Sequence, residues 1–358
     1  RDRLVSRWGV DALRNQTLAS LASRIFRDRH LRSGPAPWKK ATSVKKRVTK
    51  TGFRDERRSY RAFAGNRTVR EAAARSLWGG MMIAFLRGLT VRPLVELDVV
   101  SLYPHAAILQ PLPYQRTRWR PLRNLGELDH VEGFAKVEFQ FPEGFGYPNL
   151  PVARDGVNRL VFTRTGISDT TVAELRVALR LGAHVRVVDS HVFTPGERER
   201  NHDLAAYMRE VLADKAAAQK GSIEYAISKL LANGLIGKLM ERFSGSTLLD
   251  FERAAQRQGY SAGLGSAVAT SPVLADALKR GVEAGALFAP EWASLTLGRS
   301  RAIAGDICAK GEVLLASTDA FVVAPGTDLT CPGLAELHAV GSGLRLEHAA
   351  DAAFIVRA

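Results

Sequence analysis

The chain has 358 residues, of which 46% are hydrophobic, and this excludes a disordered chain and allows two or three units with cores of their own. No apolar run approaches the roughly 20 residues of a membrane span, no signal peptide is evident, and the two cysteines lack the spacing of a zinc site or a disulfide framework. A net charge of +15, from 51 Lys and Arg against 36 Asp and Glu, favours a polyanionic partner such as nucleic acid, with a general basic bias as the alternative.

The N-terminal part of the chain is expected to be helical and then strongly basic. Residues 1–30 repeat apolar residues at three- and four-residue spacing, which predicts a helix. Residues 39–61 hold ten basic and two acidic residues with Phe53 and Tyr60 interleaved. Such a pattern suits a path along phosphates with bases stacked on the aromatics, and a solvated linker is the alternative. A helix then ends at "LWGG", where paired glycines let the backbone pass close to a large group or simply turn.

Two carboxylates stand at the ends of predicted strands. The run "PLVELDVV" predicts a strand that reaches Asp98, and a helix starts near Pro104. Far along the chain, "EVLLASTDAFVVAP" predicts a strand, a tight turn containing Asp319, and a second strand. Asp in a hairpin turn is common. If these strands are neighbours in one sheet, however, the two carboxylates converge and could hold two divalent ions about 4 Å apart for in-line phosphoryl transfer.

Between these strands the sequence predicts a mixed region and then helices. Residues 111–200 combine strand-like runs with one helix, and residues 201–243 have a helical pattern. Within it, "SKLLANGLIGKL" places Lys229, Asn233 and Gly237 on one helical face. A lysine there can hold a triphosphate, although an ordinary helix with a C-terminal glycine explains the pattern as well. Residues 245–295 are rich in Gly, Ala and Ser and give no clear pattern.

Taken together, these segments resemble the family B DNA polymerases. "DVVSLYP" is similar to motif A of that family, "KLLANGLIGK" to motif B and "STDAF" to motif C, and they occur in the family's order. "LWGG" is similar to the family's Tyr-x-Gly-Gly element. The resemblance covers about residues 60–358. The long separation between motifs B and C leaves room for an insertion, as in the protein-primed and primer-independent branch of phages and plasmids.

The resemblance implies roles for individual residues. Asp98 and Asp319 are the implied catalytic residues and, with the backbone carbonyl of Val99, the ligands of two Mg²⁺ or Mn²⁺ ions. Tyr103 is expected to pack under the incoming sugar and to exclude a 2′-hydroxyl. The residues implied to bind the nucleotide are Val99, Ser101, Leu102, Tyr103, Lys215, Lys229 and Asn233. The residues expected to bind DNA are Trp78, Gly79, Gly80 and Gly237, together with Lys45, Lys46 and Arg47 of the basic segment.

The chain also departs from the family pattern. Ser317 stands where motif C has its first Asp, and Ala320 where it ends in Ser. In motif B, Gly234 replaces Ser and Ile236 replaces Tyr. The sequence stops about forty residues after Asp319, before the Lys-x-Tyr element that grips the primer, and shows no exonuclease motifs. For the chain as given we therefore expect no proofreading and no full thumb, and a processed or excised fragment of a longer protein would explain both departures.

The predicted fold is α+β: a polymerase palm, in which helices back an antiparallel sheet, with helical fingers in a right-hand architecture that lacks a full thumb. The expected function is a template-directed DNA polymerase core that adds dNTPs to a 3′-hydroxyl by two-metal-ion transfer. The alternatives are a catalytically degenerate DNA-binding or accessory protein and a template-independent nucleotidyltransferase. The expected partners are primer–template DNA, dNTPs and a priming protein or a further subunit or domain that supplies the thumb, with no membrane.

The expected location is the bacterial cytoplasm, in phage or plasmid replication. The expected division of the chain is an N-terminal helical and basic segment (1–75), palm with motif A (76–110), a palm insertion similar to terminal-protein region 1 (111–200), fingers with motif B (201–245), a second insertion (246–295) and palm with motif C (296–358).

Overall fold

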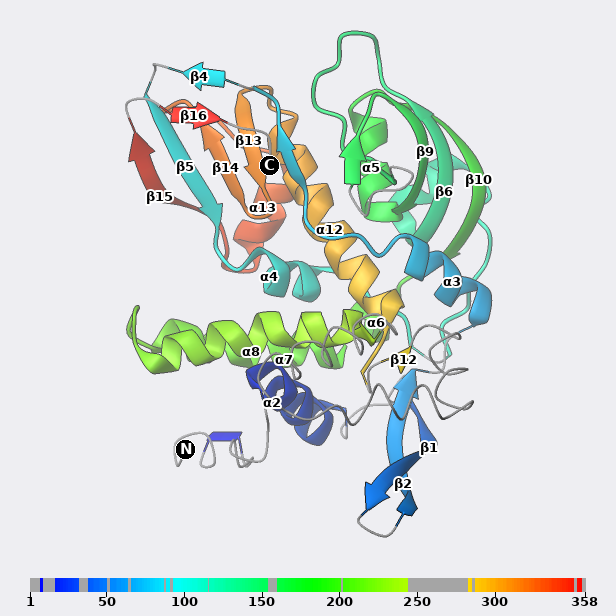
Figure 1. Cartoon of the computed structure of the whole chain (residues 1–358). Coiled ribbons are helices and arrows are strands. Elements are labelled where there is room, and N and C mark those ends of the chain that lie inside the picture. Colours follow the sequence, from blue (N-terminus) through cyan, green and yellow to red (C-terminus); the bar gives the residue numbers. More distant parts are fainter. Residues whose placement is uncertain are drawn as a thin grey trace.

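The computed structural model of the chain is shown in Figure 1. It describes residues 7–8, 17–31, 38–49, 52–63, 66–86, 88–90, 93–114, 116–153, 160–200, 202–243, 283–284, 287–350 and 353–355. The second predicted insertion, 246–295, therefore lies largely outside the described residues. Within the described part of the chain, no helix combines the length and apolar character that crossing a membrane requires.

A five-stranded antiparallel sheet carries both predicted carboxylates. Its strand order is β15-β5-β14-β13-β3, with β3 at Met82–Ala84, β5 at Leu94–Val99, β13 at Val313–Ser317, β14 at Ala320–Val323 and β15 at Leu344–Ala350. Because side chains alternate along a strand, Val95, Leu97 and Val99 face one side of β5 and Asp98 faces the other. The apolar side packs against the long helix α12 (Pro290–Cys308) and α13 (Pro332–Ala339). The predicted antiparallel sheet backed by helices is thus confirmed (Figure 1).

A second sheet lies within residues 111–200. It has the order β10-β6-β9, with β6 at Glu132–Gln140, β9 at Thr165–Thr171 and β10 at His184–Phe193. Helix α5 (Val172–Arg180) follows β9 directly and packs against this sheet and α12. The mixed pattern of strands around one helix, predicted for this part of the chain, is confirmed.

A helical layer covers the end of the first sheet where β5 continues into α4 (Leu102–Leu109). Helices α7 (Asp203–Ala217) and α8 (Ile223–Met240) form the hairpin predicted for residues 201–243, and α7 packs against α4 (Figure 1). The predicted N-terminal helix is present as α2 (Leu18–Ile25), which continues as the π-helical turn η2 (Phe26–His30). A Cβ added at Gly234 of α8 would lie 3.1 Å from Cα of Ala19, so the glycine allows α2 to approach α8 closely without a tight contact at this point.

The basic segment forms a hairpin. Strand β1 (Trp38–Thr49) pairs along its whole length with β2 (Gly52–Phe63), so the basic residues lie on paired strands rather than on the linker that was the alternative. Lys45, Lys46 and Arg47 lie on β1, and their side chains are outside the description. The remaining elements are α3 (Arg67–Arg75), β4 (Gly88–Thr90), η3 (Leu125–His130), β7 (Pro151–Ala153), β8 (Leu160–Phe162), α6 (Glu197–Arg200), β11 (Arg242–Phe243), β12 (Glu283–Ala284) and β16 (Ala353–Ile355).

Helix α12 joins the apolar cores. Its first half, including Trp292, belongs to the core beneath α7 and α8, and its second half, including Ile307, belongs to the core of the five-stranded sheet. Between them, Ala302 packs against Ala173 and Val177 of α5. One helix therefore contributes side chains to each of these three apolar clusters.

A buried ion pair fixes α12 to α5. Arg301 of α12 donates from Nε to Glu174 Oε1 at 2.7 Å, and both side chains are fully buried. Glu174 also accepts from the backbone N–H and the hydroxyl of Thr171, at 3.0 and 2.8 Å. Arg301 Nη2 donates to Glu174 Oε2 at 3.2 Å, and Nη1 donates to the carbonyl oxygens of Trp78 and Gly79 at 2.6 and 2.9 Å. One buried cation thus ties together the second sheet's helix, α12 and the "LWGG" segment.

Replacing Arg301 by Met should lower the free energy of unfolding by about 3 to 5 kcal/mol, because it leaves the Glu174 carboxylate buried without its partner. Urea denaturation followed by circular dichroism measures this loss. The double variant Arg301→Met/Glu174→Gln should regain at least half of it, because Gln keeps an acceptor for Thr171 without a charge. Equal losses in the single and double variants would show that the pair's charge is not what matters.

Candidate active site

The structure brings the two predicted carboxylates together on adjacent strands. Asp98 of β5 lies directly opposite Ala320, the first residue of β14, so Asp319 is one residue from this pair. The backbone N–H of Val99 donates to the carbonyl oxygen of Asp319 at 2.8 Å. The turn before β14 has a left-handed residue, Thr318, with φ of 61°, whose hydroxyl donates to Asp319 Oδ1 at 2.7 Å. Pairing and turn together fix where both carboxylates lie.

The electrostatics of this pair favour a cation. Burial first, and then the neighbouring charge of Asp319, raise the pKa of Asp98 above its ordinary value, while Arg345 and Lys229 oppose the shift. Two close carboxylates repel each other unless a positive charge lies between or beside them. Oxygen ligands of this kind suit Mg²⁺, so the donor set fits a hard divalent cation. Among the described residues, no group of three or more acidic, His or Cys side chains is placed to hold a metal ion.

A small cavity of about 110 Å³ opens beside the carboxylates. Two lysines reach it from the helical hairpin: Lys215 on α7 and Lys229 on α8. Lys215 Nζ lies 2.6 Å from the hydroxyl of Ser101 and 5.2 Å from the centre of the Tyr225 ring. The residues that line the cavity are Asp98, Val100, Ser101, Leu102, Tyr103, Pro104, Leu212, Lys215, Tyr225, Lys229, Ala232, Asn233, Asp319 and Arg345.

The start of α4 supplies backbone donors to the same cavity. Ser101 has a left-handed backbone, with φ of 55°, and it precedes the first helical residue, Leu102. The first N–H groups of a helix have no partner within the helix. No side chain caps this end of α4, and Leu102 is among the residues that line the cavity.

The "LWGG" segment lies against the same site. A Cβ added at Gly80 would overlap the hydroxyl of Tyr103 and lie 3.0 Å from Cγ2 of Thr318, whereas one added at Gly79 meets nothing within 4 Å. Tyr103 and Thr318, the residue before Asp319, thus both lie close to Gly80. The indole N–H of Trp78 donates to the carbonyl oxygen of Asp169 at 3.2 Å. Gly80 thus allows the close contact between this segment, Tyr103 and the turn that carries Asp319.

Most of the predicted nucleotide-binding residues meet in the cavity, but not every predicted residue does. Val99 is fully buried and does not line it, so its carbonyl ligand role stays a prediction. Gly237, two turns beyond Lys229 on α8, is also outside the lining, with open space where its Cβ would be. Sequence reasoning missed Tyr225 and Arg345. Tyr225 lies one helical turn before Lys229 and on the same face, which is a signal that could have found it.

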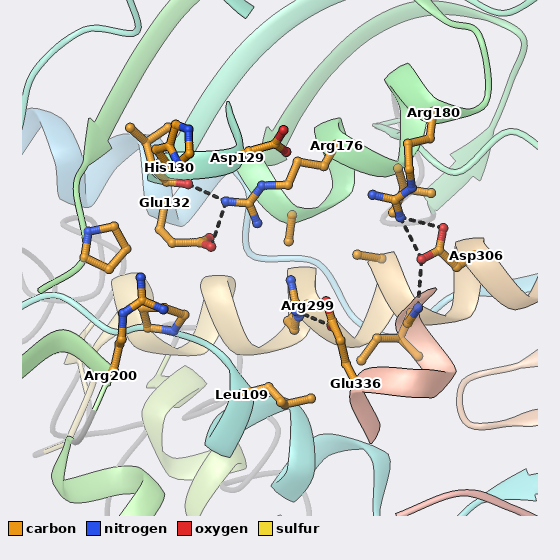
Figure 2. A pocket seen from close by; sticks show the side chains of 18 residues that line it. Leu109, Asp129, His130, Glu132, Arg176, Arg180, Arg200, Arg299, Asp306 and Glu336 are labelled. Carbon is orange, nitrogen blue, oxygen red and sulfur yellow. Dashed lines mark hydrogen bonds and ion pairs between the residues drawn. The ribbon is translucent and has the colours of Figure 1, made fainter. Parts of the chain in front are cut away.

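A larger cavity, of about 330 Å³, lies elsewhere, between α5, the start of β6, α12 and α13 (Figure 2). Four arginines line it, and three of them are paired with carboxylates from other elements. We interpret this cavity as part of the packing interface between the helices of the two sheets, because carboxylates already neutralise most of its cationic groups. The pairs are Arg176 with Glu132 at 2.8 Å, Arg180 with Asp306 at 2.7 Å, and Arg299 with Glu336.

Comparisons with known proteins agree with this geometry. Residues 5–244 match the family described as DNA polymerase type B, organellar and viral. Over 134 residues, 36% of this chain and 15% of the relative, the chain is 33% identical to the primer-independent DNA polymerase PolB of Escherichia coli.

Solved structures show the same fold. The orthorhombic crystal form of Phi29 DNA polymerase matches 91% of this chain with a TM-score of 0.58 at 12% identity. Phi29 DNA polymerase complexed with primer-template DNA and incoming nucleotide substrates matches 90% with a TM-score of 0.56 at 13% identity. The chain spans about half the length of these two proteins. The likeness confirms the polymerase fold predicted from the sequence.

Replacing Gly80 by Ala should lower the free energy of unfolding by about 1 to 3 kcal/mol, because the new methyl group has to displace Tyr103 or Thr318. The matched control is Gly79→Ala, which adds the same atom to open space and should change stability by less than about 0.5 kcal/mol. Urea denaturation compares the two variants. Equal effects would show that the close approach at Gly80 carries no constraint.

Proposed function

Since the chain belongs to the organellar and viral type B DNA polymerases, we propose that it is a template-directed DNA polymerase core that adds dNTPs to a 3′-hydroxyl. The observation that carries this proposal is the meeting of Asp98 and Asp319 beside a cavity that Lys215 and Lys229 enter from a helical hairpin. Carboxylates for a divalent cation and lysines for a triphosphate are the two kinds of group that nucleotidyl transfer needs at one place.

In this proposal Asp98 and Asp319, with the carbonyl of Val99, would hold two Mg²⁺ or Mn²⁺ ions, which would supply activation of the primer hydroxyl and charge stabilisation for the leaving pyrophosphate. The chain's own groups bind and orient the nucleotide. Lys215 and Lys229 neutralise the triphosphate, and the backbone N–H groups of Ser101 and Leu102 donate to it. In-line attack requires this fixed alignment of the triphosphate with the primer terminus.

The remaining predicted residues select and hold the substrates. Tyr103 packs under the sugar of the incoming nucleotide, where its ring leaves no room for a 2′-hydroxyl. Asn233 and Gly237 of α8 lie along the nascent base pair, and Trp78, Gly79 and Gly80 contact the template backbone. The basic hairpin β1–β2, with Lys45, Lys46 and Arg47, binds DNA phosphates.

The parts of the fold take the corresponding roles. The five-stranded sheet is the palm, α7 and α8 are the fingers, and the sheet of β6, β9 and β10 is an insertion similar to terminal-protein region 1. Primer–template DNA and dNTPs are the substrates. A priming protein, or a further domain or subunit that supplies the thumb, is the proposed partner.

A second candidate is a catalytically degenerate DNA-binding protein. It is favoured by Ser317, which stands where the family has a carboxylate, and by the contact of Arg345 with Asp98 at 3.3 Å. A template-independent nucleotidyltransferase would use the same site. Primer extension separates the three functions.

Asp98→Asn and Asp319→Asn should each lower primer extension at least a hundredfold, about 2.7 kcal/mol in transition-state free energy, with DNA affinity retained. A labelled primer–template with dNTPs and Mg²⁺ or Mn²⁺ measures this. The matched control is Asp129→Asn, an exposed residue of η3 outside the cavity of Asp98, which should extend normally. Full extension by Asp319→Asn would remove its catalytic role. Extension of a single-stranded primer alone would support the template-independent transferase.

Tyr103→Ala should reduce discrimination against ribonucleotides by about tenfold or more, because the ring that meets the 2′-hydroxyl is gone, and the ratio of kcat/KM for dNTP and rNTP measures it. Taking a ratio corrects for any general loss of activity in the variant. An unchanged ratio would contradict the assignment of Tyr103 as the group that reads the sugar.

A further inference from the structure

Arg345 lies beside the catalytic carboxylates on the edge strand of the sheet. Strand β15 pairs with β5 on the side opposite β14, and Arg345 is the direct cross-strand partner of Asp98. Directly opposed residues of an antiparallel pair project from the same face and interact. The guanidinium Nη2 accordingly lies 3.3 Å from Asp98 Oδ2. The register of the sheet therefore holds a permanent positive charge next to a carboxylate that is proposed to bind a divalent cation.

The guanidinium has other neighbours in this position. Arg345 is paired with Glu347 of the same strand, and Tyr225 of α8 lines the same cavity. Burial alone would raise the pKa of Tyr225, but Lys215 and Arg345 together bring it below its ordinary value. The side chain of Arg345 is 38% exposed, so it has room to move away from Asp98. Its Nε has no hydrogen-bond partner in the structure.

The charges around the cavity show what Arg345 does there. Two carboxylates, Asp98 and Asp319, face three cationic side chains, Lys215, Lys229 and Arg345. Ser317 contributes no charge at the position where the family has a third carboxylate. Arg345, which is also paired with Glu347, thus neutralises one of the two carboxylates in the cavity lining, through an oxygen that a divalent cation would need. A guanidinium and a divalent ion repel each other, so both cannot occupy that oxygen at once.

We propose that Arg345 is a positioning residue that competes with the divalent cation for Asp98 and thereby sets the affinity of the site for that cation. The inference rests on the proposed function, because that function is the reason to expect a divalent cation at Asp98. It makes Arg345 the internal counter-ion of the cation-free site, released toward solvent when the divalent ion binds.

Binding of Mn²⁺ to the full chain, without DNA or nucleotide, tests this directly, with free Mn²⁺ measured by electron paramagnetic resonance. Arg345→Gln and Arg345→Met should each lower the Kd for Mn²⁺ at least threefold, and Arg345→Lys, which keeps the charge, should stay closer to the unmodified chain. Asp98→Asn should abolish the Mn²⁺ binding whose Kd changes when Arg345 is replaced, and this result would identify Asp98 as the binding site.

The matched control is Arg186→Gln, which removes the same charge from an exposed arginine paired with Glu138 on the second sheet. It should leave the Kd for Mn²⁺ unchanged, so that a general effect of net charge is excluded. Circular dichroism verifies that each variant is folded. The proposal is overturned if the unmodified chain, Arg345→Gln and Arg345→Met bind Mn²⁺ with equal affinity, or if none of them binds it measurably. Weaker binding of Mn²⁺ by both variants than by the unmodified chain overturns it as well.

Primer extension by the unmodified chain distinguishes failure of this proposal from failure of the proposed function. If the chain extends no primer and Arg345→Gln still binds Mn²⁺ more tightly, the competition at Asp98 stands and the polymerase activity does not. If the chain extends primers and the Mn²⁺ affinity is the same with and without Arg345, the activity stands and the competition does not.

Discussion

The buried guanidinium of Arg301 is the contact on which the arrangement of the site depends. An arginine that is removed from water needs a partner for its charge and for its five N–H groups. Glu174 supplies the charge, and the carbonyls of Trp78 and Gly79 supply further acceptors. These partners come from widely separated parts of the sequence, so satisfying one side chain brings α5, α12 and the glycine segment to fixed positions.

From the contacts of Arg301, a series of close contacts leads to the carboxylates of Asp98 and Asp319. The segment that Arg301 holds continues to Gly80, which lies against Tyr103 and Thr318. Thr318 in turn is hydrogen bonded to Asp319. On the other side, strand pairing alone places Asp98 between Ala320 and Arg345. The site is therefore built by backbone register on one side and by side-chain packing on the other. Only the packing side requires residues without a Cβ.

Local patterns in the sequence predicted the elements and the residues of the site that lie on them. The strand that ends near Asp98, the turn at Asp319 and the helix that carries Lys229 each follow from hydrophobic periodicity. The resemblance to a known family then supplied their pairing. The hairpin β1–β2 was not predicted, because its run of basic residues shows no alternation of apolar and polar residues, the pattern from which strands are predicted.

What the sequence could not predict depends on contacts between distant residues. Arg301 and Glu174 are 127 positions apart, and nothing near either residue indicates a partner. Arg345 similarly depends on which strand becomes the neighbour of β5, a question of topology that no local pattern answers. The resemblance implied a DNA-binding role for Gly237, which stays a prediction, since the described cavity is lined by the part of that helical face nearest Lys229.

The position of α12 has a consequence for how the molecule unfolds. Cooperative unfolding requires that no part can lose its structure without exposing apolar surface of the others. Because α12 supplies side chains to the core under the helical layer, to the core of the five-stranded sheet and to the contact with α5, none of these three can melt while the helix stays buried. We therefore expect the two sheets, although each has its own strands, to unfold in one thermal transition, and Asp98 and Asp319 to keep their places until that transition.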